Sequence, residues 1–142
     1  MESEKWNAIH DELKSLLEKE VNLMRELLAN MHQEELSMLF LDEGSLKILQ
    51  SQRLILSERL DELRQKRATA SERIATYGSD DALSPEVISL KEQQSALAEQ
   101  MHRQQSQNQH LYDHPHASPP IALQRQARAR RKASIATIQI NR

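Results

Sequence analysis

The sequence contains no cysteine, only two glycines and only four aromatic residues in 142 positions. The lack of cysteine excludes a disulfide-stabilised scaffold, a thiolate zinc site and a cysteine nucleophile. So few glycines and aromatic residues do not supply the turns and strand-forming side chains that a sandwich, a barrel or a doubly wound sheet needs. The composition therefore predicts an all-α protein.

The chain also lacks long apolar runs. No stretch approaches the roughly 18 apolar residues of a membrane span. The first residues, Met1 to Lys5, are acidic and lead into an amphipathic pattern, unlike a signal peptide or an arginine-rich transit peptide. We therefore expect a cytoplasmic protein with no membrane insertion.

Charge is distributed unevenly along the chain. Residues 113–142 contain six of the 19 lysines and arginines but only one of the 21 acidic residues, so this segment carries a net charge of +5 and the remainder −7. Prolines 115, 119 and 120 prevent a helix from continuing into it. The sequence predicts two parts: a helical bundle over residues 1–112 and a flexible basic tail over residues 113–142.

The first predicted helix covers approximately residues 4–41. Apolar side chains recur there at spacings of three and four, which is the period of an amphipathic helix. They are Trp6, Ile9, Leu13, Leu16, Leu17, Val21, Met24, Leu27, Leu28, Met31, Leu36 and Met38. A helix of this length needs a partner helix. We expect it to end before Gly44, with Gly44 in the left-handed conformation and Asp42 or Ser45 capping the next helix.

The second predicted helix covers approximately residues 45–77. Its stripe consists of Leu46, Leu49, Arg53, Leu56, Leu60, Leu63, Ala70, Ile74 and Tyr77. Charged residues indicate a solvated outer surface, to which we assign Arg53, Glu58, Arg59, Asp61, Glu62, Arg64, Lys66 and Arg67.

The third predicted helix covers approximately residues 85–112. Ser84, Pro85 and Glu86 form a strong helix start, because serine caps, proline fits the first helical position and glutamate faces the positive end of the helix dipole. Its apolar seam of Leu90, Leu97, Met101 and Leu111 is interrupted by Gln94, Gln104 and Asn108. Polar seam residues weaken packing, so the end of this helix is where we expect another chain to complete the bundle.

No catalytic or metal-binding pattern is evident. Three of the six histidines, His110, His114 and His116, are close in sequence, but Pro115 separates them and no paired carboxylates complete a ligand set. We expect His10 and His32 to lie on the surface. The sequence has no nucleophile elbow and no glycine-rich phosphate loop, and its basic run lacks aromatic residues for base stacking. We therefore expect no enzymatic activity, cofactor, metal or nucleic-acid partner.

Three helical segments, an Asp-Glu-Gly-Ser break, Gln52-Arg53 before Leu56 and Leu60, and Leu111-Tyr112 ahead of a polar tail together resemble the FlgN family of type III export chaperones. The resemblance implies an elongated antiparallel three-helix bundle or coiled coil. It also implies a cytosolic chaperone of a flagellar-type secretion system that holds an amphipathic C-terminal segment of a secreted, hook-associated-type or effector protein.

The resemblance also implies two binding sites. Together with the weak seam, it assigns client binding to Val87, Leu90, Gln94, Leu97, Met101, Gln104 and Asn108. It assigns docking on the cytoplasmic domain of the export gate to Leu111 and Tyr112, although Asp113 stands where the family has glycine. A monomer or a weak homodimer is expected.

Two alternatives remain open at this stage. One is a coiled-coil stalk or escort protein of the export ATPase, which would need one long uninterrupted hairpin. The other is a structural coiled coil that self-associates through the same apolar stripe.

Overall fold

The computed structural model describes residues 2–77 and 83–114, which form three helices: α1 (Glu2–Leu39), α2 (Glu43–Tyr77) and α3 (Pro85–Asp113). No strand occurs within these two ranges. The all-α prediction is therefore confirmed for the described chain, and each helix boundary lies within two residues of the predicted one. The predicted flexible tail lies outside the described residues from position 115 onward.

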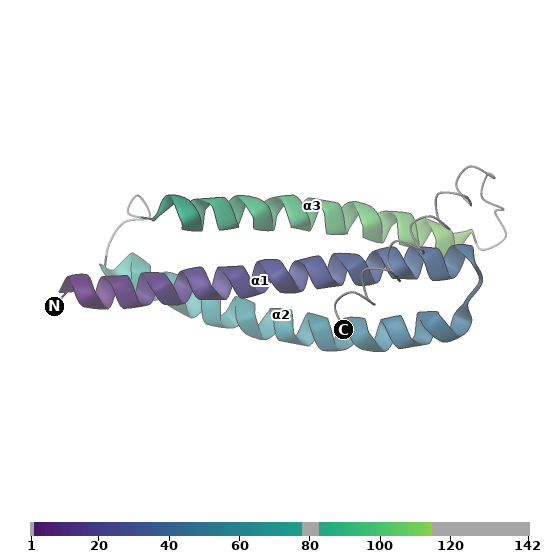
Figure 1. Ribbon diagram of the computed structural model, residues 1–142, viewed down its shortest axis with the longest axis horizontal. Coiled ribbons are helices and arrows are strands. Elements are labelled where there is room, and N and C mark those ends of the chain that lie inside the picture. Colours follow the sequence, from purple (N-terminus) through teal and green to yellow (C-terminus); the bar gives the residue numbers. More distant parts are fainter. Residues whose placement is uncertain (1, 78–82, 115–142) are drawn as a thin grey trace, which may run out of the picture.

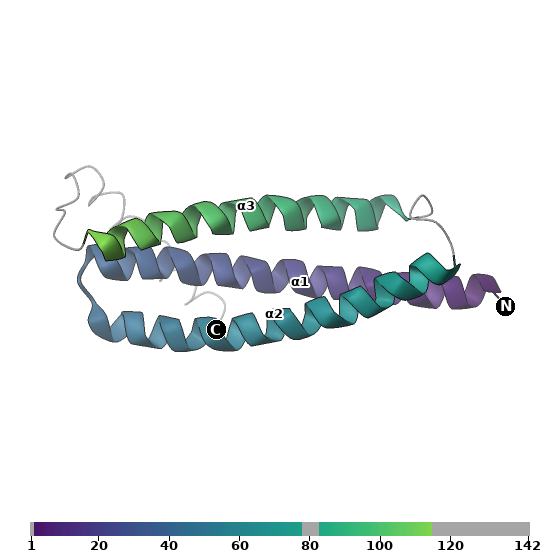
Figure 2. The same cartoon turned by 180° about the vertical axis from the view of Figure 1, so that it is seen from behind.

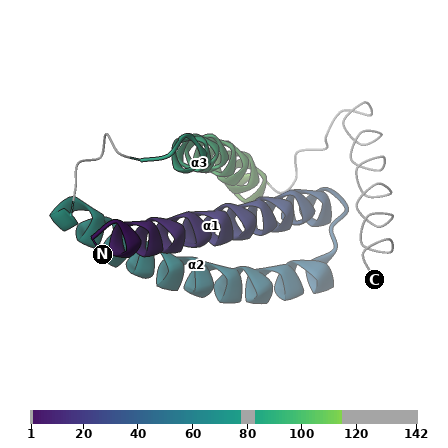
Figure 3. The ribbon, with the colours of Figure 1, turned by 60° about the vertical axis from the view of Figure 1, so that its left-hand side comes forward.

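Helix α1 lies in the middle of an elongated bundle, with α2 and α3 packed against it (Figure 1). The view from behind and the oblique view show the same order (Figures 2 and 3). Helix α2 runs back along α1, and α3 runs in the direction of α1 again. Helices α2 and α3 contact each other only slightly. The bundle therefore depends on α1 as its common partner.

The burial of α1 explains its central place. Of the twelve buried apolar residues of the described chain, eight belong to α1, namely Leu13, Leu16, Leu17, Val21, Met24, Leu27, Met31 and Leu36. The closely spaced pair Leu16 and Leu17 widens the apolar face, so that one helix packs against two neighbours. This confirms most of the stripe that the sequence predicts for the first helix.

Apolar and charged layers alternate where α1 packs against α2. On α1, four residues spaced seven positions apart, from Leu13 to Glu34, face α2. On α2, four residues with the same spacing, from Ile74 back to Arg53, face α1. The layers are Leu13 with Ile74, Glu20 with Arg67, Leu27 with Leu60, and Glu34 with Arg53. The stripe predicted for the second helix correctly includes Arg53, but the assignment of Arg53 and Arg67 to a solvated outer surface is wrong, because each arginine turns toward α1 and pairs with a buried carboxylate.

The turn between α1 and α2 is capped as predicted by Asp42. Its Oδ1 accepts a hydrogen bond from the backbone N–H of Ser45 at 3.1 Å, and its Oδ2 accepts one from the Ser45 hydroxyl at 2.7 Å. The left-handed residue is not Gly44 but Leu41, which has φ 55°. Gly44 already lies in the first turn of α2. The prediction was wrong because α1 ends earlier, so the reversal of the chain falls on Leu41.

Replacing Leu41 by glycine is expected to raise the free energy of unfolding by up to about 1 kcal/mol, because glycine adopts positive φ without the steric cost that leucine bears. The Leu41→Ala variant is the matched control, because it removes the same exposed side chain but keeps a Cβ atom. Urea denaturation followed by circular dichroism measures both variants. If alanine stabilises as much as glycine, removal of the side chain rather than relief of the backbone is the cause.

The predicted start of α3 is confirmed. The Ser84 hydroxyl accepts a hydrogen bond from the backbone N–H of Val87 at 3.3 Å, and Pro85 occupies the first turn. His10 also belongs to this junction, because its Nε2 accepts a hydrogen bond from the backbone N–H of Ser84 at 3.2 Å. The surface prediction is wrong for this half-buried histidine, whereas His32 is exposed as expected.

Candidate functional site

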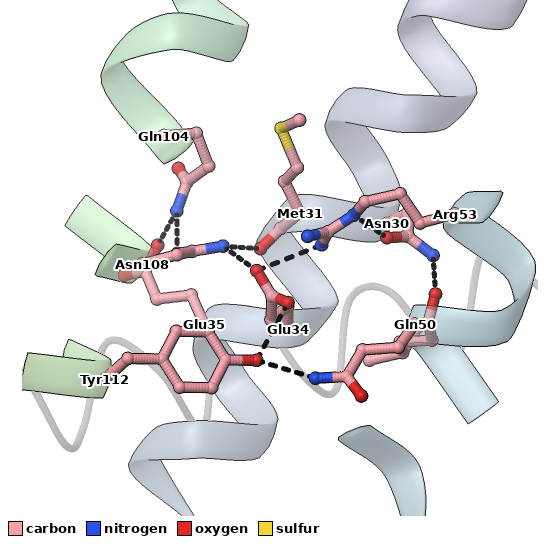
Figure 4. A network of polar contacts seen from close by, with 10 residues as sticks. Asn30, Met31, Glu34, Glu35, Gln50, Arg53, Gln104, Asn108 and Tyr112 are labelled. Atoms are coloured by element: carbon pink, nitrogen blue, oxygen red, sulfur yellow. Dashed lines mark hydrogen bonds and ion pairs between the residues drawn. The ribbon is translucent and has the colours of Figure 1, made fainter. Parts of the chain in front are cut away.

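The end of the bundle where α1 and α3 finish and α2 begins is held by a polar network (Figure 4). Its centre is Glu34 of α1, whose side chain is 3% exposed. The Glu34 carboxylate accepts hydrogen bonds from the Asn108 amide at 2.7 Å and from the Tyr112 hydroxyl at 3.0 Å. An arginine nitrogen of Arg53 lies 3.0 Å from the same carboxylate. One acidic residue therefore connects all three helices.

Asn30 extends the network between α1 and α2. Its Oδ1 accepts a hydrogen bond from Nε of Arg53 at 2.9 Å, and its Nδ2 donates one to the backbone carbonyl of Leu49 at 3.0 Å. Arg53 is thereby fixed by a hydrogen bond to Asn30 and an ion pair with Glu34, both on α1. Burial of a carboxylate is costly unless it is paired and hydrogen-bonded, and these contacts of Glu34 offset that cost.

Gln104 and Asn108 extend the network onto α3. The Gln104 amide donates hydrogen bonds to Asn108 Oδ1 at 2.9 Å and to the Glu35 carboxylate. The Asn108 amide also donates to the backbone carbonyl of Met31 at 2.9 Å. Two of the three polar seam residues that the sequence identifies, Gln104 and Asn108, are therefore hydrogen-bonded inside the chain itself, which fixes how the end of α3 lies on α1.

Tyr112 has its hydroxyl inside the network and part of its ring in solvent. The hydroxyl donates to Glu34 and accepts a hydrogen bond from the Gln50 amide at 3.1 Å. Burial raises the pKa of Tyr112 above its ordinary value of 10, and the hydrogen bond to Glu34 raises it further, although the Gln50 amide opposes the rise. The residue as a whole is 41% exposed. Its contacts hold the ring in one position at the surface.

The predicted client-binding residues fall into two groups. Val87 is fully buried with the apolar cluster around Leu17, and Gln104 and Asn108 are buried in the polar network. The other group is only partly buried and comprises Leu90, Gln94, Leu97 and Met101. A client can reach the second group directly, but it contacts the first only if α3 moves away from α1. The client role of both groups stays a prediction.

The apolar contacts of α3 lie N-terminal to the residues that join the polar network. Leu90 packs against the cluster that contains Val87, and Leu97 and Met101 pack against the cluster of Met24, Leu27 and Leu60. After Met101 the buried positions of α3 are polar. Leu111 is partly buried near the helix end.

The outer side of the same part of α3 forms a shallow hollow with a polar lining. Its described lining residues are His102, Gln105, Ser106, Gln109, His110 and Asp113. A polar lining does not suit an apolar client. Nowhere within residues 2–77 and 83–114 do three or more histidine or acidic side chains group as metal ligands. The described helices also include none with an apolar stretch long enough to cross a membrane.

Comparison of the chain with protein-family models, with curated proteins and with solved structures finds no match. The similarity to the FlgN family therefore rests on the residues quoted above and stays a prediction. The structure shows two kinds of contact between α3 and the rest of the bundle. Apolar packing holds its first half, and hydrogen bonds hold its last turns.

Proposed function

We propose that this protein is a cytosolic export chaperone of a type III, flagellar-type secretion system. In this proposal it holds an amphipathic C-terminal segment of a secreted subunit and delivers that segment to the cytoplasmic domain of the export gate. The observation that supports it best is the change in packing along α3, from apolar contacts up to Met101 to hydrogen bonds at Gln104 and Asn108. An elongated antiparallel bundle of coiled-coil type is the form in which we expect it to act.

Client binding would exchange hydrogen bonds within the bundle for apolar contacts with the client. The hydrogen bonds that hold the last turns of α3 go mainly to the carboxylates of Glu34 and Glu35, and a bond to a charged group contributes about 1.5 to 3 kcal/mol net. A client helix that buries several large apolar side chains gains about 1.5 to 3 kcal/mol for each. The partly buried Leu97 and Met101 offer such a client its first contacts, and methionine adapts its shape to different partners. The gain from a client is then of the same size as the cost of opening the last turns of α3, and such a balance suits a protein that must bind and release.

Tyr112 is the proposed contact for the export gate. Its ring is exposed while its hydroxyl is held by Glu34 and Gln50. A fixed aromatic ring at a surface is a favourable anchor for another protein, because little side-chain freedom is lost on binding. Leu111 precedes it and is partly buried.

A photo-crosslinking amino acid at position 101 tests client binding in the cytosol of the source organism. We expect it to capture a secreted subunit of the export apparatus, with the crosslink in that subunit's C-terminal segment. The same amino acid at position 18, on the exposed side of α1, is the matched control and should not capture that subunit. Capture of the subunit equally from both positions, or of no secreted protein from either, contradicts the proposed client site.

Replacement of Tyr112 tests the gate contact. Tyr112→Ala should weaken binding to the purified gate domain at least tenfold while leaving client binding nearly unchanged. Tyr112→Phe is the matched control, because it keeps the ring and loses only the bonds to Glu34 and Gln50, with a stability loss of about 1 kcal/mol. If phenylalanine weakens gate binding as much as alanine, the hydroxyl network rather than the ring is what the gate requires.

A further inference from the structure

The side of α2 that faces away from α1 exposes large apolar residues near the start of the helix. Ile48, Leu54 and Ile55 are 61%, 63% and 51% exposed. They account for half of the large apolar side chains that are exposed in the described chain. Exposed apolar residues gathered on one helix face indicate an interaction surface.

Gly44 lies on this same side, and no contact within residues 2–77 and 83–114 requires glycine there. Its φ is not positive. Among these described residues a Cβ atom added at position 44 would meet Asp42 Oδ1 alone, at an ordinary 3.8 Å. Glycine in a helix is less favourable than alanine by up to about 1 kcal/mol. A glycine that neither a turn nor internal crowding explains is a site where another backbone can approach closely.

Small and large residues form two adjacent rows on this surface, each with a seven-residue spacing. Gly44 and Ser51 form the small row, and Ile48 and Ile55 form the large one. All four are exposed. If two such helices lie side by side in opposite directions, Ile55 of one meets Gly44 of the other, and Ile48 meets Ser51. A twofold axis repeats both contacts, so the surface is complementary to itself.

We propose that this face of α2, defined by Gly44, Ile48, Ser51, Leu54 and Ile55, pairs with the same face of a second copy of the chain in antiparallel orientation. Each isoleucine fills the space above a small residue of the other copy, as knobs fill holes in paired helices.

One flanking residue is compatible with this pairing. With Ile55 opposite Gly44, Lys47 lies within one helical turn of Leu54 of the second copy, so its aliphatic part can cover that leucine while the ammonium group stays in water. The exposed side of α1 carries Glu18, Lys19 and Glu26 instead and offers no such apolar surface.

The size of the contact predicts a weak dimer. Helix pairing from Gly44 to Ile55 extends over about 18 Å. It therefore buries less than the roughly 1,200 Å² in total that marks the lower limit of standard specific interfaces. We expect a dissociation constant on the order of 10 µM. The inference is independent of the proposed chaperone function, and it uses a face of α2 that leaves Leu97, Met101 and Tyr112 of α3 free.

Sedimentation equilibrium of the full chain over a range of concentrations tests the dimer. Ile48→Lys should weaken it at least tenfold, and Gly44→Leu should weaken it similarly by filling the space that Ile55 needs. Ile88→Lys is the matched control, since Ile88 is also an exposed isoleucine, 47% exposed, but lies on α3. This variant should leave the dimer unchanged. Circular dichroism establishes that each variant keeps its helices. A wild-type chain that is monomeric throughout overturns the proposal, as does equal weakening by Ile88→Lys.

Spin labels test the orientation. Because the chain has no cysteine, a single Lys47→Cys or Glu62→Cys variant carries one label per copy. In the antiparallel pair the two labels at position 62 are separated by roughly 40 Å, whereas those at position 47 are much closer. Short distances at both positions indicate a parallel pair and overturn the proposed geometry.

Discussion

Replacing Glu34 by alanine is expected to lower the free energy of unfolding by about 3 kcal/mol. The change leaves Arg53, Asn108 and the Tyr112 hydroxyl without their shared acceptor. Loss of one partner from a buried ion pair costs about 3 to 5 kcal/mol, and the lower limit applies here because Arg53 is 26% exposed and water can reach it. Urea denaturation followed by circular dichroism measures the loss.

The Glu34→Gln variant tests the contribution of the negative charge, because it keeps the size of the side chain. Glutamine fills the same space and keeps one acceptor oxygen, so the loss should be only about 1 to 2 kcal/mol. Hydrogen exchange adds a local readout, because the amides of the last turns of α3, around Asn108 and Tyr112, should lose protection before those of its first turns. Uniform loss of protection along α3 would contradict the central role that we give to Glu34.

The second large effect concerns Glu20, which is fully buried. Arg67 Nε lies 2.7 Å from its carboxylate. Within the described chain neither carboxylate oxygen of Glu20 has a hydrogen bond of good geometry, so attraction between the charges is what offsets the cost of burial. Arg67→Met should therefore cost about 3 kcal/mol, because the carboxylate is left in the interior without its countercharge. Arg73→Met is the control, since Arg73 pairs with exposed Glu12 at 3.6 Å, and it should cost less than about 1 kcal/mol.

A double-mutant cycle completes this test. Glu20→Leu combined with Arg67→Met replaces the pair by apolar side chains of similar size. The double variant should unfold with a free energy within about 1 kcal/mol of the wild-type value or above it, because no buried charge remains. If the stability loss of the double variant equals the sum of the losses of the two single variants, the two residues act independently, contrary to the structure.

The sequence predicts the three helices well because their signals are local. A stripe with a period of 3.6 residues identifies α1, and the sequence Ser84-Pro85-Glu86 identifies the start of α3. The reversal after α1 was predicted on the correct segment, with Asp42 as its cap. The left-handed residue was assigned wrongly to Gly44, because the preference of glycine for positive φ is strong and the predicted end of α1 lies two residues beyond the observed one.

The buried charges were missed for a different reason. Arg53 and Arg67, taken alone, are typical of a solvated surface, and so are Glu20 and Glu34. Their burial becomes recognisable only when the seven-residue series of α1 is compared with that of α2 in reverse order, where each acidic residue meets a basic one. Such pairing is a property of two helices together, so inspection of each helix separately could not reveal it.

The candidate site was predicted in part. Gln104 and Asn108 were identified as unusual seam residues, and the structure shows what they contact: Glu34, Glu35 and the backbone of Met31. Their burial in the chain's own network could not be predicted, because the acceptors lie on α1, about 75 positions earlier. The roles of Leu97, Met101 and Tyr112 toward other proteins stay predictions.

The alternating layers between α1 and α2 also restrict how the two helices can meet during folding. A shift of one heptad would place Glu20 against Ile74, Arg67 against Leu27 and Glu34 against Leu60, so each charge would be desolvated against an apolar side chain. A hairpin shifted by seven residues is therefore much less stable than the observed one. The two charged layers thus specify the alignment of the hairpin against which α3 packs.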